Sequence, residues 1–122
     1  MHNMIPLDNP LFSTEHTRVY HEALFTNNAP HHFTVHRSDG VGNTLLAEVS
    51  FQEGPILEHG VNGIHNEDLL SMVITRLEHF QKSPFACREN AIALTHLESA
   101  VLFLRKRTLS RQARGVEGTG VI

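Results

Sequence analysis

Residues 66–81, NEDLLSMVITRLEHFQ, decide the fold of the second half of this chain. The apolar residues recur three or four positions apart, which is the spacing of one face of an α-helix: Leu70, Val73, Ile74, Leu77 and Phe80. Asn66 is a good N-cap, and the two acidic residues after it complement the positive end of the helix dipole. The stretch therefore predicts an amphipathic helix from about residue 66 to residue 81, ended by Ser83-Pro84.

A second and longer helix is predicted from about Cys87 to Arg114, with Gly115 in the position where glycine most often ends a helix. At about 1.5 Å per residue it is about 40 Å long, more than the core of one small domain needs. Its far end therefore projects or meets another chain. Its seam of apolar residues continues at the same spacing into Arg107 or Thr108, then Arg111 and Arg114: the apolar members are Leu94, Leu97, Val101 and Leu104.

The end of this second helix is strongly basic. One interpretation is a favourable interaction with the negative end of the helix dipole, together with solvation. The other, which we favour, is an anion site, because repulsion among like charges is offset when an anion lies between them. Arginine can hold phosphate with two hydrogen bonds and can stack on a purine. Five of the ten lysines and arginines lie here, with no acid among them: Arg105, Lys106, Arg107, Arg111 and Arg114.

The segment that follows, GVEGTG at residues 115–120, contains three glycines and a threonine. Glycine lets backbone N–H groups approach a ligand closely, so an arginine face followed by this loop favours nucleotide recognition. The alternative is a helix cap with a flexible tail, because the segment lacks the Gly-Lys-Ser/Thr of a phosphate loop.

The first half of the chain predicts a β-hairpin. From Phe33 apolar and polar residues alternate, the stretch from Ser38 to Asn43 supplies a turn, and the alternation resumes from Leu45 to Gln52. Gly54-Pro55 ends the hairpin, and residues 56–59 add a third short strand. Residues 1–30 are expected to be a weakly structured arm, with at most one short ordered piece around residues 19–25.

The predicted fold class is α+β. A small antiparallel β-sheet at about residues 31–60 precedes an antiparallel two-helix hairpin at about residues 66–114 and the GVEGTG loop, all in one domain from residue 31 to residue 122. A chain of 122 residues with 40% hydrophobic content has material for one domain.

Composition also excludes several classes of function. A net charge of −3 argues against a surface coated with positive charge for non-specific DNA binding. The single cysteine, Cys87, excludes an intramolecular disulfide and fits a reducing compartment. No stretch approaches the roughly 18 apolar residues of a membrane span, and the first residues do not resemble a secretory leader. We therefore expect a cytoplasmic protein.

No catalytic or metal site is expected. The ten histidines are scattered without a metal-binding motif. Cys87 has no histidine at a recognisable motif spacing, so a small buried thiol is the simpler interpretation. No general acid/base pair stands out, and we expect no cofactor.

Three short stretches carry a resemblance to a known family: Gly60-Val61-Asn62-Gly63, Cys87-Arg88-Glu89-Asn90-Ala91 and Arg114-Gly115-Val116-Glu117-Gly118-Thr119. With the helices around them, residues 33–120 resemble the phage family of type-one Thoeris anti-defence proteins, which share their helical hairpin with the anti-CBASS sponges. The resemblance implies a sheet packed on a helical hairpin, and homodimers that can assemble further into hexamers.

The resemblance also implies a function without catalysis. Members of the family are sponges in the host cytoplasm that bind glycocyclic ADP-ribose, the signal made by TIR enzymes, and keep it from the effector. Some members also bind the cyclic trinucleotides of CBASS immunity at separate sites between dimers. Small cyclic nucleotides are thus the expected partners, and neither DNA, RNA nor a membrane is expected.

The resemblance implies which residues bind the ligand. Phe80 matches an aromatic residue that stacks on the base, and Asn90 matches a polar contact. From the residues alone, Phe80 fits a core position equally, Asn90 fits an interhelical hydrogen bond, and Phe85 competes with Phe80 for the stacking role. The remaining expected ligand-binding residues lie at the other end of the long helix and in the loop after it: Arg107, Arg111, Arg114, Glu117, Gly118 and Thr119.

Arg107 and Arg111 match arginines that grip phosphate from the other protomer, which explains the overlong helix. Glu117 and Thr119 fit lid or base contacts, and Arg114 fits either this pocket or the second kind of site. We expect alanine at position 107 or 111 to abolish ligand retention without unfolding the protein, because neither side chain contributes much apolar burial. Two other classes of function remain open: a signal-degrading enzyme and a helical nucleic-acid-binding module, whose binding would fall steeply with salt.

Overall fold

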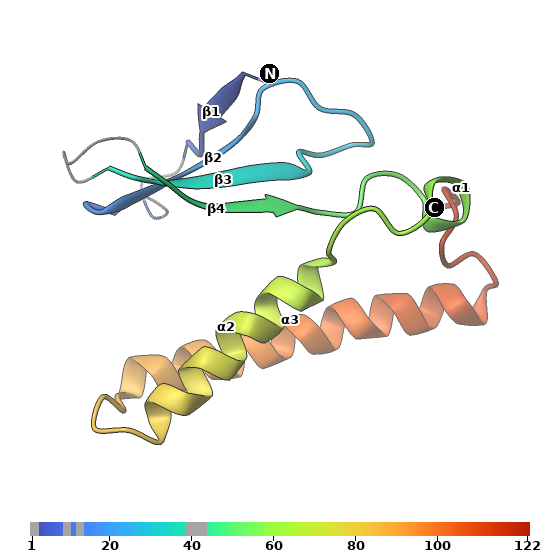
Figure 1. Ribbon diagram of the computed structural model, residues 1–122. Helices are drawn as coiled ribbons and strands as arrows, with labels where there is room; N and C mark the ends of the chain where they lie inside the picture. The colour runs from blue at the N-terminus through green and yellow to red at the C-terminus, as the bar shows by residue number, and fades with distance from the viewer. Residues whose placement is uncertain (1–2, 9–10, 12–13, 39–43) are drawn as a thin grey trace. The chain divides into compact units, whose positions relative to one another are not determined.

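The computed structural model describes residues 3–8, 11, 14–38 and 44–122. Its order of elements confirms the α+β class, with an antiparallel sheet before the helices and a long last helix (Figure 1). The chain divides into two compact units, Met1–Ile64 and His65–Ile122. The elements are β1 (Met4–Pro6), β2 (Thr17–Glu22), β3 (His32–Arg37), β4 (Leu45–Ser50), α1 (Ile56–His59), α2 (Asn66–Gln81) and α3 (Arg88–Ala113).

The first unit contains one sheet whose strands follow the order β1-β2-β3-β4, with every neighbouring pair antiparallel. β1 and β2 lie in the expected arm: β2 overlaps the short ordered piece expected around residues 19–25 but begins at Thr17, whereas the expectation is wrong for β1. β2 pairs with β3 from Thr17↔Arg37 to His21↔Phe33. Ladder pairing with a strand distant in sequence stabilises a segment whose own composition is polar.

The expected hairpin is confirmed as β3 and β4, which pair from His32↔Ser50 to His36↔Leu45 with a register shift between Val35 and His36. Residues 39–43 of its expected turn lie outside the described residues. The apolar face of the sheet carries side chains such as Val19, Val35 and Phe33. No apolar side chain in the described part of the chain is buried, so neither unit closes a dry core of its own.

Residues 56–59 form the short helix α1, so the expectation of a third strand there is wrong. Pro55 immediately precedes the helix, and its fixed φ of −63° suits a helix start. Gly60, with φ of +71°, ends the turn in a conformation that side chains disfavour. The proline before residues 56–59 thus favours a helical turn there over the strand that their two apolar residues suggested.

Within the first unit, the Gly60–Gly63 stretch is hydrogen-bonded to the residues that follow β4. The Asn62 side chain accepts a hydrogen bond from the backbone N–H of Glu53 and donates one to its carbonyl oxygen, both at 2.8 Å. Gln52 donates to the carbonyl of Gly60 and accepts from the N–H of Asn62. A Cβ at position 63 would collide with the backbone of Phe51. The stretch therefore has a structural role.

The second unit is an antiparallel hairpin of α2 and α3. The carboxylate of Asp68 accepts a hydrogen bond from the N–H of His65 at 2.9 Å, and His65 is the N-cap. The expected N-cap, Asn66, is instead the first helical residue, so that prediction is wrong by one position. In the turn, the Gln81 side chain bonds both the N–H and the carbonyl oxygen of Cys87 at 3.0 Å. Gly115 has φ of +73°, as a C′ glycine should.

The half-buried seam of α3 follows the predicted spacing and continues through Thr108, not Arg107. Arg107 is exposed, whereas Thr108 is half-buried and Arg111 is buried. α3 is about 39 Å long and α2 about 24 Å, at about 1.5 Å per residue. The last residues of α3 therefore run beyond the start of α2, which confirms that the helix is longer than its intramolecular partner. Every helix in the described part of the chain is too short or too polar to cross a bilayer.

Candidate functional site

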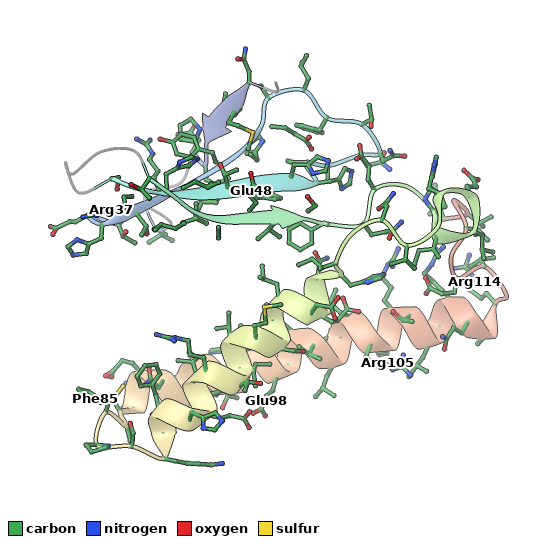
Figure 2. All side chains as sticks on the ribbon, viewed as in Figure 1. Arg37, Glu48, Phe85, Glu98, Arg105 and Arg114 are labelled. Carbon is green, nitrogen blue, oxygen red and sulfur yellow. The ribbon has the colours of Figure 1, made fainter. Side chains whose placement is uncertain are left out.

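The expected ligand-binding residues lie at the two ends of the helical hairpin. Phe80 is near the end of α2 and Asn90 is in the first turn of α3, whereas Arg107 and Arg111 lie in the last two turns of α3. Seventeen positions of continuous helix separate Asn90 from Arg107, which is about 25 Å at 1.5 Å per residue. One protomer therefore cannot place both groups on one small ligand. Figure 2 labels Phe85 and Arg114, which lie near these two ends.

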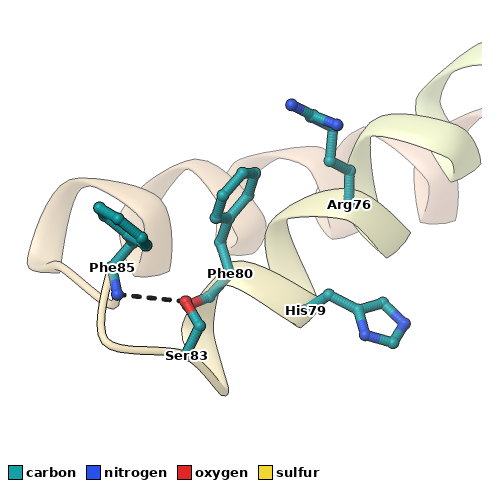
Figure 3. Close-up of a pocket in the computed structure, with 5 residues that line it drawn as sticks. All are labelled: Arg76, His79, Phe80, Ser83 and Phe85. Atoms are coloured by element: carbon teal, nitrogen blue, oxygen red, sulfur yellow. Dashed lines mark hydrogen bonds between the residues drawn. The ribbon is translucent and has the colours of Figure 1, made fainter.

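A pocket of about 460 Å³ opens at the turn end of the hairpin (Figure 3). Phe80 is half-buried and forms part of the wall, so it is not enclosed in a core. The turn is held by Ser83, whose hydroxyl donates to the carbonyl of Phe80 at 2.6 Å and accepts from the N–H of Phe85 at 3.1 Å. The lining residues are Arg76, His79, Phe80, Ser83 and Phe85.

The pocket is aromatic and cationic. The guanidinium carbon of Arg76 lies over the Phe80 ring, 5.1 Å from its centroid. Phe85 is 74% exposed beside it. A flat apolar wall with an arginine suits a planar ring that carries negative charge nearby. Sequence reasoning missed Arg76, although its position one helical turn before Phe80 signals that the two side chains share a face.

Asn90 lies at the same end of the hairpin but is not among the residues that line this pocket. Its side chain is half-buried. In the regions that the structure describes, its amide makes no interhelical hydrogen bond of the kind that the residues alone would favour. Its polar groups are therefore available to a ligand or to a second chain.

At the far end, Arg111 is the centre of a folded C-terminal segment. It is only 8% exposed. Its guanidinium donates to the carbonyl oxygens of Val121 at 2.7 Å, Val116 at 2.9 Å and Thr119 at 3.1 Å. Its Nε lies 3.8 Å from a carboxylate oxygen of Glu117. Arg111 thus lies on the inner stripe of α3, as its spacing predicted, and the segment after the helix surrounds its guanidinium.

The residues of the GVEGTG segment bond mainly to one another. The Glu117 carboxylate accepts from the N–H of Gly118 at 3.1 Å, and Gly118 has φ of +80°. The Thr119 hydroxyl donates to the carbonyl of Val116 and accepts from the N–H of Val121. The segment is thus an ordered turn fastened to Arg111, in place of the flexible tail that we considered as an alternative.

Arg107 and Arg114 differ from Arg111 in their exposure. Both side chains are exposed. Arg114 donates to the backbone oxygen of Ile122 at 2.9 Å. Within the described residues, no ion pair or side-chain hydrogen bond occupies Arg107. Of the predicted arginines, Arg107 is therefore the one most open to an external anion.

The histidine, cysteine and acidic side chains were also considered as ligands for a metal ion, and Cys87 as a thiol. Across the described residues, no three histidine, cysteine or acidic side chains are arranged to hold a metal ion. Cys87 is exposed, as the N-cap of α3, so the expectation of a buried thiol is wrong. The turn places its backbone, and not its side chain, in the hydrogen bonds with Gln81.

Comparison with known proteins identifies the family of this chain. Residues 45–109, which include β4, α2 and most of α3, match the family described as "Acb2/Tad1, hairpin domain". The chain is also 48% identical to "Thoeris anti-defense 1" of Bacillus phage SBSphiJ7, in an alignment that covers 95% of this chain and 98% of that protein. The match confirms the family that the sequence motifs indicated. This chain belongs to the Acb2/Tad1 hairpin-domain family.

Proposed function

We propose that this chain is a phage anti-defence protein that binds a cyclic-nucleotide immune signal of the Thoeris system, glycocyclic ADP-ribose, and keeps it from its effector without degrading it. The observation that carries the proposal is the similarity, over nearly the whole chain, to a protein named "Thoeris anti-defense 1". The proposed site of action is the cytoplasm of the infected host cell. Cyclic trinucleotides are a second proposed class of ligand, at separate sites.

The placement of aromatic and cationic groups supports binding of such a signal. A cyclic ADP-ribose carries a purine base, for which Phe80 offers a stacking surface, and a diphosphate, for which Arg107 offers a planar cation. Because about 25 Å of helix separates these ends, a complete site needs Phe80 and Asn90 from one protomer and Arg107 from its partner. Two-fold symmetry would then create two identical sites, for which Arg114, Glu117, Gly118 and Thr119 are further candidate contacts.

The surface of the hairpin supports a homodimer, with hexamers as a further proposed assembly. Leu102 and Phe103 on α3 are 68% and 70% exposed, and Met72 on α2 is 60% exposed. Large exposed apolar side chains on helices that bury no dry core of their own favour association with another chain. A second copy that runs antiparallel to the first would cover these residues and bring opposite hairpin ends together.

Sequestration is preferred to catalysis because the three principal proposed ligand contacts, Phe80, Asn90 and Arg107, include neither a general acid/base pair nor an activated nucleophile. A nucleic-acid-binding module is less favoured because the chain has a net charge of −3 and its basic residues gather at one helix end. Both alternatives predict different fates for a bound signal.

The first test is capture and release. Purified protein incubated with glycocyclic ADP-ribose, freed of unbound ligand by gel filtration and then heat-denatured, should release the unchanged molecule at about one equivalent per protomer. Mass spectrometry of the released ligand checks its identity. Chemically altered ligand would establish an enzyme instead. Failure to capture it, combined with salt-sensitive binding to RNA or DNA, would favour the nucleic-acid module.

The dimer has its own test. Phe103→Glu should shift the protein from dimer to monomer, because a carboxylate in an apolar interface loses its hydration without a partner. Light scattering coupled to gel filtration measures the mass. Phe103→Leu, which keeps an apolar side chain, is the matched control and should remain dimeric. A Phe103→Glu protein that is still dimeric would place the interface on another face.

A further inference from the structure

Arg76 is an exposed cation whose charge is not neutralised nearby. It lies on α2 one turn before Phe80, and its guanidinium carbon sits over the Phe80 ring at 5.1 Å. Among the residues that the structure describes, no carboxylate forms an ion pair with it. Arg76 and Phe80 project to the same side of the helix, whereas His79 points away (Figure 3). The Arg76 side chain is therefore held by its contact with the Phe80 ring, and its positive charge remains available to a negatively charged ligand.

This arrangement changes how a planar base can reach Phe80. The guanidinium carbon lies over one face of the Phe80 ring, so a planar base that approaches from that side meets Arg76 first. A guanidinium is planar and has two faces, so it can stack on phenylalanine with one and on a purine with the other. A lysine has a point charge and no such plane. On that side of the ring, a ligand therefore meets the guanidinium before the phenylalanine.

We propose that Arg76 is a ligand-binding residue that stacks between Phe80 and the purine base of the bound nucleotide, so that base recognition in this pocket depends on an arginine plane and not on the phenylalanine ring alone. The inference rests on the proposed function for the identity of the natural ligand. The stacking itself depends only on the pocket, on Arg76 and on Phe80.

The test compares variants of the full chain by calorimetry with glycocyclic ADP-ribose. Arg76→Ala should raise the Kd about tenfold or more, as loss of a base-stacking side chain commonly does. Arg76→Lys should weaken binding nearly as much, because it keeps the charge and loses the plane. Lys82→Ala, which removes another exposed cation at the same end of the hairpin, should bind like the wild type. An unchanged Kd for Arg76→Ala, or full rescue by Arg76→Lys, overturns the inference.

A second experiment separates a failure of the stacking role from a failure of the proposed function. Adenosine monophosphate at millimolar concentration should shift the NMR signal of the Arg76 Nε–H in the wild type, because the base contacts the guanidinium, and should shift the Phe80 ring signals more in Arg76→Ala, where the ring is uncovered, than in the wild type. Absence of the wild-type shifts overturns the stacking role. If the shifts occur but glycocyclic ADP-ribose is not captured, the stacking role stands and the proposed function fails.

Discussion

Arg107→Ala is expected to abolish retention of glycocyclic ADP-ribose and to leave the melting temperature nearly unchanged. The side chain is exposed, and within the described part of the chain it makes no ion pair or hydrogen bond that the fold would lose. A bidentate contact between guanidinium and phosphate is among the strongest that a protein makes, so its loss should raise the Kd about 100-fold or more. Calorimetry measures the affinity and differential scanning fluorimetry checks the fold.

Arg105→Ala is the matched control for this experiment. Arg105 is also exposed on the same helix, but a shift of two positions along an α-helix turns the side chain to a different face. It should bind the ligand like the wild type. Equal losses from both substitutions would indicate general charge attraction, and normal binding by Arg107→Ala would show that the phosphate site lies elsewhere.

Complementation between two inactive variants tests whether the site is shared between protomers. In a heterodimer of Phe80→Ala with Arg107→Ala, one pocket lacks both residues and the other contains an intact Phe80 and an intact Arg107. Co-refolding the two variants should therefore restore about one quarter of the wild-type capacity, since about half of the dimers are mixed and each has one working site. No recovery would show that both residues serve a ligand within one chain.

The helices were predictable from the sequence because their signals are local. The stripe from Leu70 to Phe80, the acids after Asn66 and the glycine at position 115 all report on neighbours within a few residues. β1 and β2 were missed because their stabilising partners lie elsewhere: Val19 pairs with Val35 across the sheet, and the short strand Met4–Pro6 has almost no pattern of its own. Non-local pairing leaves little trace in local composition.

The candidate site was only partly predictable, again because local spacing in the sequence does not report on contacts with distant residues. Helical spacing correctly placed Arg111 on the inner stripe of α3, but spacing cannot tell that the chain would return to surround its guanidinium with backbone carbonyls. Phe80 was identified through resemblance, whereas Arg76 was missed because a single arginine in an exposed helix position looks like a solubilising residue. Only the observed contact with the ring makes it notable.

Arg111→Ala is expected to release the C-terminal segment from the end of α3. Three carbonyl oxygens would lose a charged donor, and such hydrogen bonds contribute about 1.5–3 kcal/mol each before the released carbonyls regain water. Backbone amides that the turn now protects, such as those of Val116 and Thr119, should exchange with deuterium about tenfold faster or more. The helical signal in circular dichroism should be nearly unchanged, because α2 and α3 do not depend on this guanidinium.

The same substitution should also remove ligand capture, for a reason different from that of Arg107→Ala. Without a ligand, the Arg111 guanidinium already donates hydrogen bonds to the backbone carbonyls of Val116, Thr119 and Val121. Its contribution to ligand binding therefore includes holding in place the segment that carries Glu117 and Thr119. Arg111→Lys tests this, because a lysine keeps the charge but cannot reach three carbonyls with a planar fork. Lysine should fail to restore either protection or capture. If it restores capture while the segment still exchanges rapidly, Arg111 acts on the ligand by charge alone and the ordered segment is dispensable.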